Sequence, residues 1–232
     1  MKGLCIVHVP TLTMVLACLG VASGQSIGVG IKVGFPVTEN FDAGSGGYTK
    51  ADFTSSSKTK RYTLGLTGIV YLPHRLGIEV DGLYRRLNYD WFNASSPSAS
   101  DAGVVYDRTN AVGNRIDIPV LLRWSPIRRL YAVGGPAFGI HFGFDERRHF
   151  TQDLVLAGYS DTLISSSEPF AHRVSTGITL GVGFDAGAKR LHVKPEVRWS
   201  HWIAPAFDTY LYLTPTTNEV EVLVGFEFGG GR

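Results

Sequence analysis

The chain has 232 residues, 44% of them hydrophobic, and its 22 Lys and Arg against 20 Asp and Glu give a formal net charge of +2. This near balance of charge gives no sign of a nucleic-acid-binding protein. The length suits a single domain. We therefore predict one domain over residues 25–232, preceded by a short leader.

Residues 1–24 have the organisation of a secretory signal peptide. Lys2 is followed by an apolar segment and then by small residues, which predicts cleavage before Gln25. Cys18 ends a sequence that loosely resembles a lipoprotein box, so lipidation at this residue is an alternative. Because Cys5 also lies in this leader, we expect neither a disulfide nor a cysteine-ligated metal in the exported chain.

The rest of the chain is dominated by segments in which apolar residues alternate with small or polar ones. This period of two is typical of β-strands with one apolar face. No apolar run of 18 residues follows Gln25, so we expect no membrane-spanning helix. The predicted strands are 26–36, 62–72, 76–89, 114–124, 130–144, 173–184, 191–202 and 218–228.

The two faces differ most clearly in the last strand. One face carries Val and Phe, and the other carries Glu219, Glu221 and Glu227. The strand 130–144 is Gly-rich and its facing is ambiguous; the more apolar choice points Leu130, Ala132, Phe138, Ile140 and Phe142 outward. Pro119, Pro136 and Pro195 fall within predicted strands, and since each removes a ladder donor, we expect bulges or strand ends there.

Long and short connections alternate between these strands. The long ones are 37–60, 90–109, 145–169 and 203–217, and the short ones are 73–75, 125–128 and 185–189. This rhythm predicts an all-β fold: an eight-stranded antiparallel up-and-down transmembrane β-barrel with four long exterior loops and three short periplasmic turns. An apolar patch at 154–157 is compatible with a hairpin that extends above the barrel.

Aromatic residues gather toward the ends of the predicted strands. Such residues form girdles where a barrel wall meets the membrane–water interface. The alternative is that they are the ordinary strand aromatics of a soluble β-sandwich. The predicted girdle residues are Tyr62, Tyr84, Tyr89, Trp91, Trp124, Tyr131, Phe184, Trp199, Trp202 and Phe228.

The less apolar face carries charges of both signs. The interior of an eight-stranded barrel is only wide enough for side chains to fill, and charges withdrawn from water need opposite partners. We therefore predict a salt-bridged plug, with a narrow pore lined by the same charges as the alternative. The predicted lumen network is Lys32, Glu79, Asp81, Arg85, Asp117, Arg123, Lys194, Glu196, Arg198, Glu221 and Glu227.

Candidate nucleophiles and bases are few and lie in no catalytic motif. They are the pair Ser200 and His201, His172 with Ser175, and His141. Neighbouring residues of a strand point to opposite faces, which separates Ser200 from His201. No spacing indicates a metal site. We predict no catalytic, cofactor or metal site, and keep a rim-site enzyme that modifies lipid A or phospholipid as the alternative.

Several phrases together resemble small outer-membrane β-barrel proteins of the OmpX/OmpA transmembrane-domain and PorT-like type. They are GVGIKVGFP, LGIEVDGLYRR, RIDIPVLLRW, YAVGGPAFG and NEVEVLVGFEF, and the similarity covers residues 26–228. The resemblance implies Sec-type export to the bacterial outer membrane and insertion by the barrel assembly machinery, which recognises a final strand ending in an aromatic residue. This chain departs from that pattern by continuing past Phe228 with Gly-Gly-Gly-Arg.

For such a barrel, the expected partners are outer-membrane lipid, the assembly machinery and an extracellular partner contacted through the long loops. No cofactor and no nucleic acid are expected. We predict a non-enzymatic structural or surface-interaction role.

Overall fold

The computed structural model describes residues 26–39, 44–48, 51–57, 62–95, 103–127, 129–154, 158–166, 173–187, 191–204 and 216–229. The predicted leader, residues 1–24, lies outside these ranges, so the signal peptide stays a prediction. Within the described part of the chain, no helix is long and apolar enough to cross a membrane.

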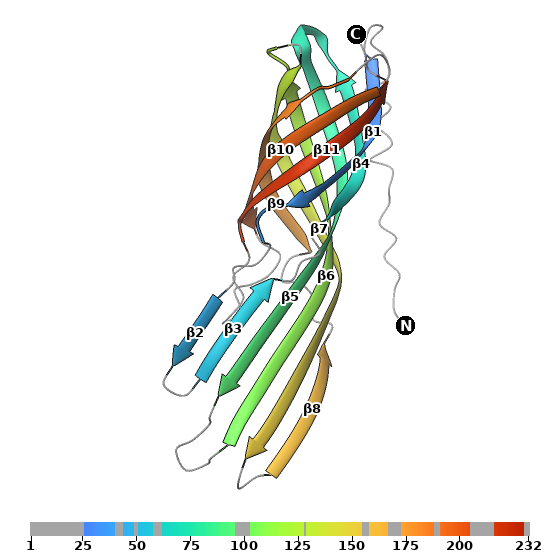
Figure 1. Cartoon of the computed structure of the whole chain (residues 1–232). Coiled ribbons are helices and arrows are strands. Elements are labelled where there is room, and N and C mark those ends of the chain that lie inside the picture. The colour runs from blue at the N-terminus through green and yellow to red at the C-terminus, as the bar shows by residue number, and fades with distance from the viewer. Residues whose placement is uncertain are drawn as a thin grey trace, which may run out of the picture.

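Eight strands form a closed antiparallel ring (Figure 1). Each pairs with the next along the chain, and the first pairs with the last to close the barrel. This confirms the predicted fold class. The ring strands are β1 (Ser26–Pro36), β4 (Thr63–Tyr71), β5 (Leu76–Ser95), β6 (Gly103–Trp124), β7 (Leu130–Leu154), β9 (Val174–Phe184), β10 (Leu191–Ala204) and β11 (Asn218–Gly229).

The closing seam between β1 and β11 shows how alternation sets the two faces of the wall. Outward-facing Val33 lies opposite Val224, whereas inward-facing Lys32 lies opposite Gly225. A Cβ at Gly225 would lie 3.6 Å from atoms of both Lys32 and Lys194. That distance is ordinary van der Waals contact, so the aliphatic parts of the two lysine side chains pack closely around this position in the narrow interior.

The short turns lie at the end of the barrel where β1 starts and β11 ends. A single 3₁₀ turn, η1 (Pro73–Arg75), joins β4 to β5, and both His74 and Arg75 have positive φ angles, 60° and 64°. The backbone N–H of Ser125 donates to the carbonyl of Arg75 at 3.0 Å. Adjacent turns are thus tied together by hydrogen bonds.

Strands β5, β6 and β7 continue far beyond the ring, so the prediction of long loops over 90–109 and 145–169 was wrong for their described residues. Here β5 and β6 stay paired out to Ser95 and Val105, and β7 pairs on its far side with β8 (Gly158–Ser166). The predicted loop 37–60 also contains a hairpin, β2 (Gly44–Tyr48) and β3 (Ala51–Ser57). These segments are polar, so the alternation that reveals a lipid-facing strand is missing from them.

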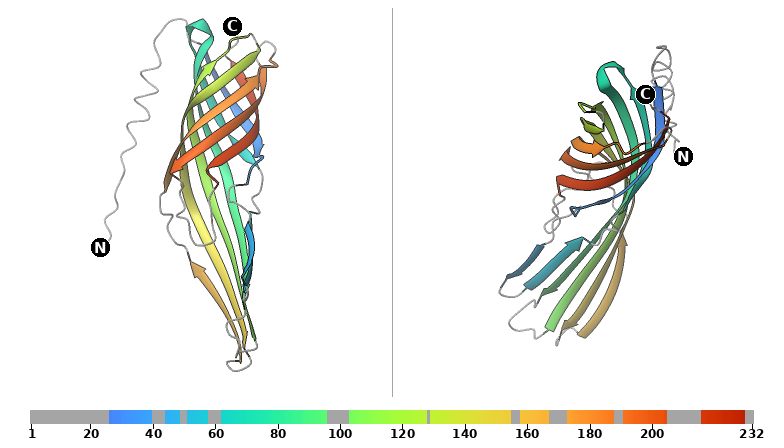
Figure 2. Two further views of the ribbon diagram at one scale, coloured as in Figure 1. Left: turned by 90° about the vertical axis from the view of Figure 1, so that its left-hand side faces the viewer. Right: turned by 45° about the horizontal axis from the view of Figure 1, so that its top comes forward.

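Together these strands form a six-stranded sheet in the order β2-β3-β5-β6-β7-β8, which we call the projecting sheet. It leaves the barrel at the end opposite the short turns, as Figures 1 and 2 show. Because three of its strands are barrel strands, its position relative to the ring is set by continuous backbone rather than by a linker.

The prolines interrupt the ladders without bulges at two of the three positions. Pairing of β5 with β6 runs to Val80–Val120 and resumes at Leu83–Asp117, which leaves out Pro119. Pairing of β6 with β7 likewise skips Pro136 between Ala137 and Gly134. Pro195 lies inside β10 and pairs with Val224 of β11, while the pairing of β10 with β9 begins only at Glu196, so the expectation of bulges or strand ends at the prolines was wrong. A missing N–H donor is thus accommodated by a local gap.

Candidate functional site

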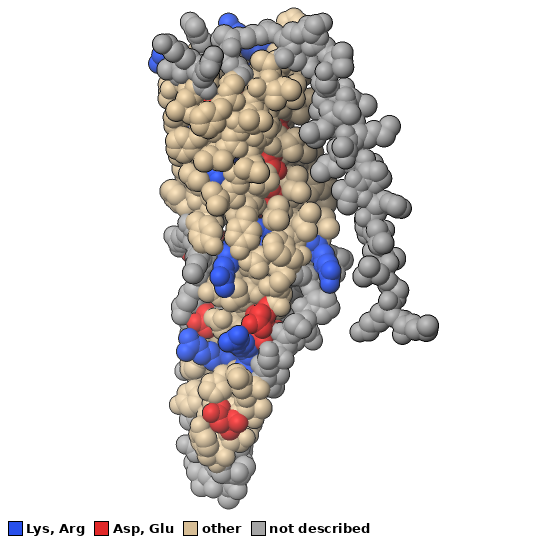
Figure 3. All heavy atoms as spheres, turned by 90° about the vertical axis from the view of Figure 1, so that its right-hand side faces the viewer, with Lys and Arg blue, Asp and Glu red and all other residues tan. Residues whose placement is uncertain are grey.

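The outer wall of the barrel is apolar and exposed. The most exposed wall residues include Leu66 (69%) and Val182 (64%). The wall seen in Figure 3 carries few charged atoms, whereas charged atoms gather where the sheet leaves the barrel. In strand 130–144, Leu130, Phe138 and Ile140 are exposed, which confirms the more apolar choice of facing. Exposed apolar area of this extent is typical of a surface that meets lipid.

Most of the predicted girdle aromatics lie on this outer wall. Trp124, Phe184 and Phe228 are exposed near the short turns, and Tyr62 and Trp199 near the other end. Tyr84 is half-buried and donates from its hydroxyl to Asn114 Oδ1 at 2.7 Å. The side chain of Tyr89 lies outside the described residues.

Three predicted girdle residues are instead buried: Trp91, Tyr131 and Trp202. Each lies at an inward position of its strand. Tyr131 follows outward-facing Leu130, and Trp202 is an odd number of residues from outward-facing Trp199, so alternation puts them on the lumen side. Grouping aromatics by their nearness to strand ends missed this difference in facing.

A network of buried ion pairs centred on Arg198 lies inside the barrel. Its side chain is 0% exposed, and its guanidinium contacts Asp81 at 2.6 Å, Glu79 at 2.7 Å and also Glu196. Lys32 reaches the same three carboxylates, Asp81 at 3.0 Å among them. Three carboxylates, two from β5 and one from β10, thus contact both Lys32 of β1 and Arg198 of β10.

Arg123 and Tyr131 extend this cluster toward the short turns. Arg123 Nη1 lies 3.2 Å from Glu79 Oε2, and its guanidinium stacks 3.5 Å above the ring of Tyr131. The Tyr131 hydroxyl donates to Glu196 at 2.9 Å. Beyond them, Lys194 pairs with Glu227 and donates to the Tyr71 hydroxyl at 2.7 Å.

A second cluster lies toward the projecting sheet. Arg85 contacts Glu221 at 2.5 Å, Asp117 at 2.9 Å and Glu219 at 3.1 Å. Arg115 contacts Glu219 at 2.6 Å and Asp117 at 2.8 Å. The sequence prediction omitted Arg115 and Glu219. Both alternate in phase with predicted lumen residues of their own strands, and that signal was available to find them.

The structure places all eleven predicted lumen residues inside the barrel wall, each at most 4% exposed. With Arg115 and Glu219, six cations face seven carboxylates, so the set is close to neutral. These thirteen residues, which we call the lumen network, come from β1, β5, β6, β10 and β11. The buried inward residues of β9 are small, namely Ser175, Gly177 and Thr179, and Thr179 shares a hydrogen bond of 2.8 Å with Ser200 of β10.

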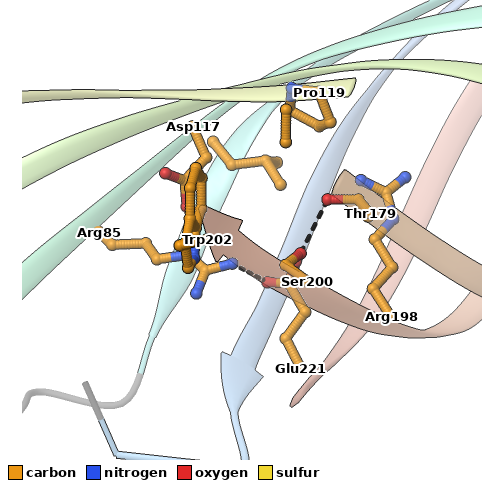
Figure 4. A pocket seen from close by; sticks show the side chains of 10 residues that line it. Arg85, Asp117, Pro119, Thr179, Arg198, Ser200, Trp202 and Glu221 are labelled. Atoms are coloured by element: carbon orange, nitrogen blue, oxygen red, sulfur yellow. Dashed lines mark hydrogen bonds and ion pairs between the residues drawn. The ribbon is translucent and has the colours of Figure 1, made fainter. Parts of the chain in front are cut away.

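Little free space remains between the two clusters. Figure 4 shows a cavity here, lined in part by Arg85, Asp117, Arg198 and Glu221, with Trp202 at its edge. Its volume is about 10 Å³, which is near the smallest that holds one water molecule. Trp202 in turn lies against the guanidinium of Arg115 at 4.8 Å.

The candidate nucleophile and base residues are arranged differently from the sequence pairing. Ser175 bonds with His141, at 2.8 Å between Oγ and Nε2, and both side chains are buried on the lumen side, away from lipid. His172 lies outside the described residues. Ser200 points inward, while His201 stacks on outward-facing Trp199 at 5.9 Å, so the expected separation of this pair is confirmed. Among the described residues, no cluster of His, Cys, Asp and Glu could hold a metal.

The projecting sheet carries ion pairs and exposed aromatics. Arg148 pairs with buried Asp107 at 2.9 Å, and Arg108 with Asp90 at 3.2 Å. The hydrogen bond to Asp90 raises the pKa of Arg108, and the one to Asp107 does the same for Arg148. Three aromatic residues of this sheet are exposed: Phe92 and Tyr106 stack with ring centroids 6.1 Å apart, and Tyr159 on β8 is 69% exposed.

A closed eight-stranded ring with an apolar outside and a charged inside defines the class of transmembrane β-barrels. Residues 23–216 match the family model of the outer membrane protein beta-barrel domain, and the chain belongs to that family. The family places it in the bacterial outer membrane. No curated protein matches the chain.

Solved structures of small outer-membrane proteins are similar at low identity. Ail, the attachment invasion locus protein of Yersinia pestis, solved with the heparin analogue sucrose octasulfate, is 7% identical over 89% of this chain and 97% of that chain, with a TM-score of 0.34. Neisserial surface protein A is 13% identical over 89% of this chain and 97% of that chain, with a TM-score of 0.34. OprG from Pseudomonas aeruginosa is 14% identical over 92% of this chain and 99% of that chain, with a TM-score of 0.36.

Proposed function

We propose that this protein is a non-enzymatic outer-membrane barrel that holds a rigid sheet outside the cell for contact with other molecules. The observation that carries the proposal is the unbroken run of β5, β6 and β7 from the barrel into the projecting sheet. A sheet built on barrel strands is anchored in the membrane, while its own surface is left available for binding.

Exposed polar and aromatic side chains support a contact role for this sheet. Arg108 is 61% exposed at its side chain, and the stacked pair of Phe92 and Tyr106 lies nearby on the same face. Arg and aromatic residues are the types enriched at protein interfaces. Among the described strands, β2 and β8 form the two edges of the sheet.

Trimming the projecting sheet will test this role. Replacing residues 90–110 with a two-residue turn should leave the ring paired. The pairs of β5 with β6 that belong to the ring all lie on the barrel side of the pair Asn88–Val112. Cells that carry the trimmed chain should adhere less to host-cell monolayers and protein-coated surfaces than cells with the intact chain. Heat-modifiable migration of the unboiled protein checks that the barrel still folds. Equal adhesion by folded, trimmed protein would contradict the proposal.

The lumen network supports a closed barrel in place of a pore. Its cations and carboxylates pair directly with one another, which leaves none of the open charged lining that an ion-selective channel needs. The space between the clusters admits about one water molecule. On this proposal the network has a structural function, because it fills the barrel and joins strands across it.

Electrical recording in planar bilayers will test the closed lumen. The folded protein should give no steady single-channel conductance, since ions would have to displace paired charges from the middle of the barrel. A variant in which both Arg198 and Arg85 are replaced by Ala has more open space beside the cavity, and its conductance is compared with that of the unaltered protein. A stable conductance of the unaltered protein, with its own ion selectivity, would show that the narrow-pore alternative is correct.

A further inference from the structure

We propose that the short turns form a basic rim that binds the phosphate groups of anionic phospholipids in the periplasmic leaflet. The segments 73–75, 125–129 and 185–190 contain five Lys or Arg and one Asp, although the whole chain has nearly equal numbers of each sign. Of these five, the structure describes Arg75 and Arg129. The proposal rests on these two residues, which we call the rim arginines.

Hydrogen bonds link each rim arginine to a neighbouring turn. The carbonyl of Arg75 accepts from Ser125 N at 3.0 Å, and its Nη1 donates to the carbonyl of Pro126 at 2.7 Å. The carbonyl of Arg129 accepts from Asp185 N at 2.7 Å. Both backbones are therefore tied to neighbouring turns at the same end of the barrel.

Neither rim arginine has a carboxylate partner among the described residues. Both are exposed, and the guanidinium contact of Arg75 is to a neutral carbonyl. The one acidic residue of the turns, Asp185, bonds with His192 Nδ1 at 2.9 Å and accepts from Gly187 N at 2.8 Å. Asp185 is therefore paired within its own turn, and none of the carboxylates that the structure describes lies in an ion pair with a rim arginine.

The depth of the rim arginines in the membrane follows from their neighbours. Ile127 is 59% exposed, Trp124 52% and Leu130 47%, and these apolar side chains lie within five residues of Arg129 along the chain. Exposed Trp marks the boundary between the hydrocarbon core and the headgroups, and exposed aliphatic side chains beside it face lipid. Long Arg side chains beside this boundary reach the headgroup phosphates while their methylene groups stay in apolar surroundings.

An anionic phospholipid therefore matches both the positive charge of the rim arginines and their depth in the membrane. Guanidinium binds phosphate oxygens with two parallel hydrogen bonds, and each basic residue near an anionic membrane surface adds about 1 kcal/mol. The contact would fix the height of the barrel in the membrane. It is independent of any binding by the projecting sheet.

Native mass spectrometry of the full chain, titrated with short-chain phosphatidylglycerol or phosphatidylcholine, will test the proposal. The protein should bind phosphatidylglycerol more tightly than phosphatidylcholine. The double variant Arg75→Gln with Arg129→Gln should bind phosphatidylglycerol about fivefold more weakly per replaced residue, with little change in its binding of phosphatidylcholine. Arg147→Gln is the matched control, because it removes one exposed charge from the projecting sheet. Arg75→Lys with Arg129→Lys keeps the charge and should retain most of the preference.

Heat-modifiable migration of every variant shows which ones fold, and the Lys variant provides the readout if the Gln variant does not. Raising the salt concentration should reduce the preference, since screening weakens contacts between exposed charges. An undiminished preference in the folded Gln variant would overturn the proposal. Equal loss in Arg147→Gln would do so too, and co-sedimentation with purified peptidoglycan without any lipid preference would assign the rim to the cell wall instead.

Discussion

Replacing Arg198 with Met will lower the free energy of unfolding by about 3–5 kcal/mol. Arg198 is fully buried and contacts three carboxylates, Glu79, Asp81 and Glu196. Methionine fills a similar space but leaves those carboxylates with Lys32 as their main remaining cation. Equilibrium urea unfolding in lipid vesicles, followed by tryptophan fluorescence, measures the change.

Two further variants identify the cause of that loss. Arg147→Met removes an exposed Arg whose partner Asp145 lies 3.3 Å away, and should cost at most about 1 kcal/mol. Combining Arg198→Met with Asp81→Asn should restore part of the lost stability, because one uncompensated carboxylate is then neutral. Full stability of the single Arg198→Met variant would mean that the lumen network does not hold the barrel together.

Replacing Val224 with Arg will lower the free energy of unfolding in the membrane by about 2–4 kcal/mol. Val224 lies in the middle of β11 and faces outward with its partners Val33 and Pro195. A guanidinium there would be placed in hydrocarbon without a counterion. The same vesicle unfolding assay measures the cost, and folding yield provides a second readout.

The control for this substitution uses the depth dependence of the lipid surface. Ile127→Arg places the same charge on the short turn at the interface, where the cost should be about 0–1 kcal/mol. Val224→Leu changes packing without adding charge and should be nearly neutral. If Val224→Arg cost no more than Ile127→Arg, β11 would not present that residue to the membrane core.

Much of the barrel could be predicted from the sequence because strand facing is a local property. Side chains alternate along an extended backbone whatever the strand's partners are, so the outward position of Val224 and the inward position of Lys32 follow from the pattern alone. The same rule, applied strictly, would also have placed Tyr131 and Trp202 inside. The spacing of turns and loops then determined the number of ring strands.

The lumen charges show the limit of such local information. Alternation indicates that Arg198 points inward, but its partners Asp81 and Glu79 are more than a hundred residues away. Which charges meet depends on the register of each strand pair and on the curvature that brings β5 to face β10. An added register shift, such as the one at Val112 and Asn114, would change every contact beyond it.

The sequence by itself therefore determined the class of fold, the two faces of each ring strand and a nearly neutral charged interior, since these depend on a period of two and on composition. Only the tertiary structure decided that polar segments continue as strands into the projecting sheet, because their pairing is stabilised by neighbouring strands and not by an apolar pattern. It also decided that Arg198 is the centre of the lumen network. That outcome depends on the register of each strand pair around the ring, which a local pattern does not encode.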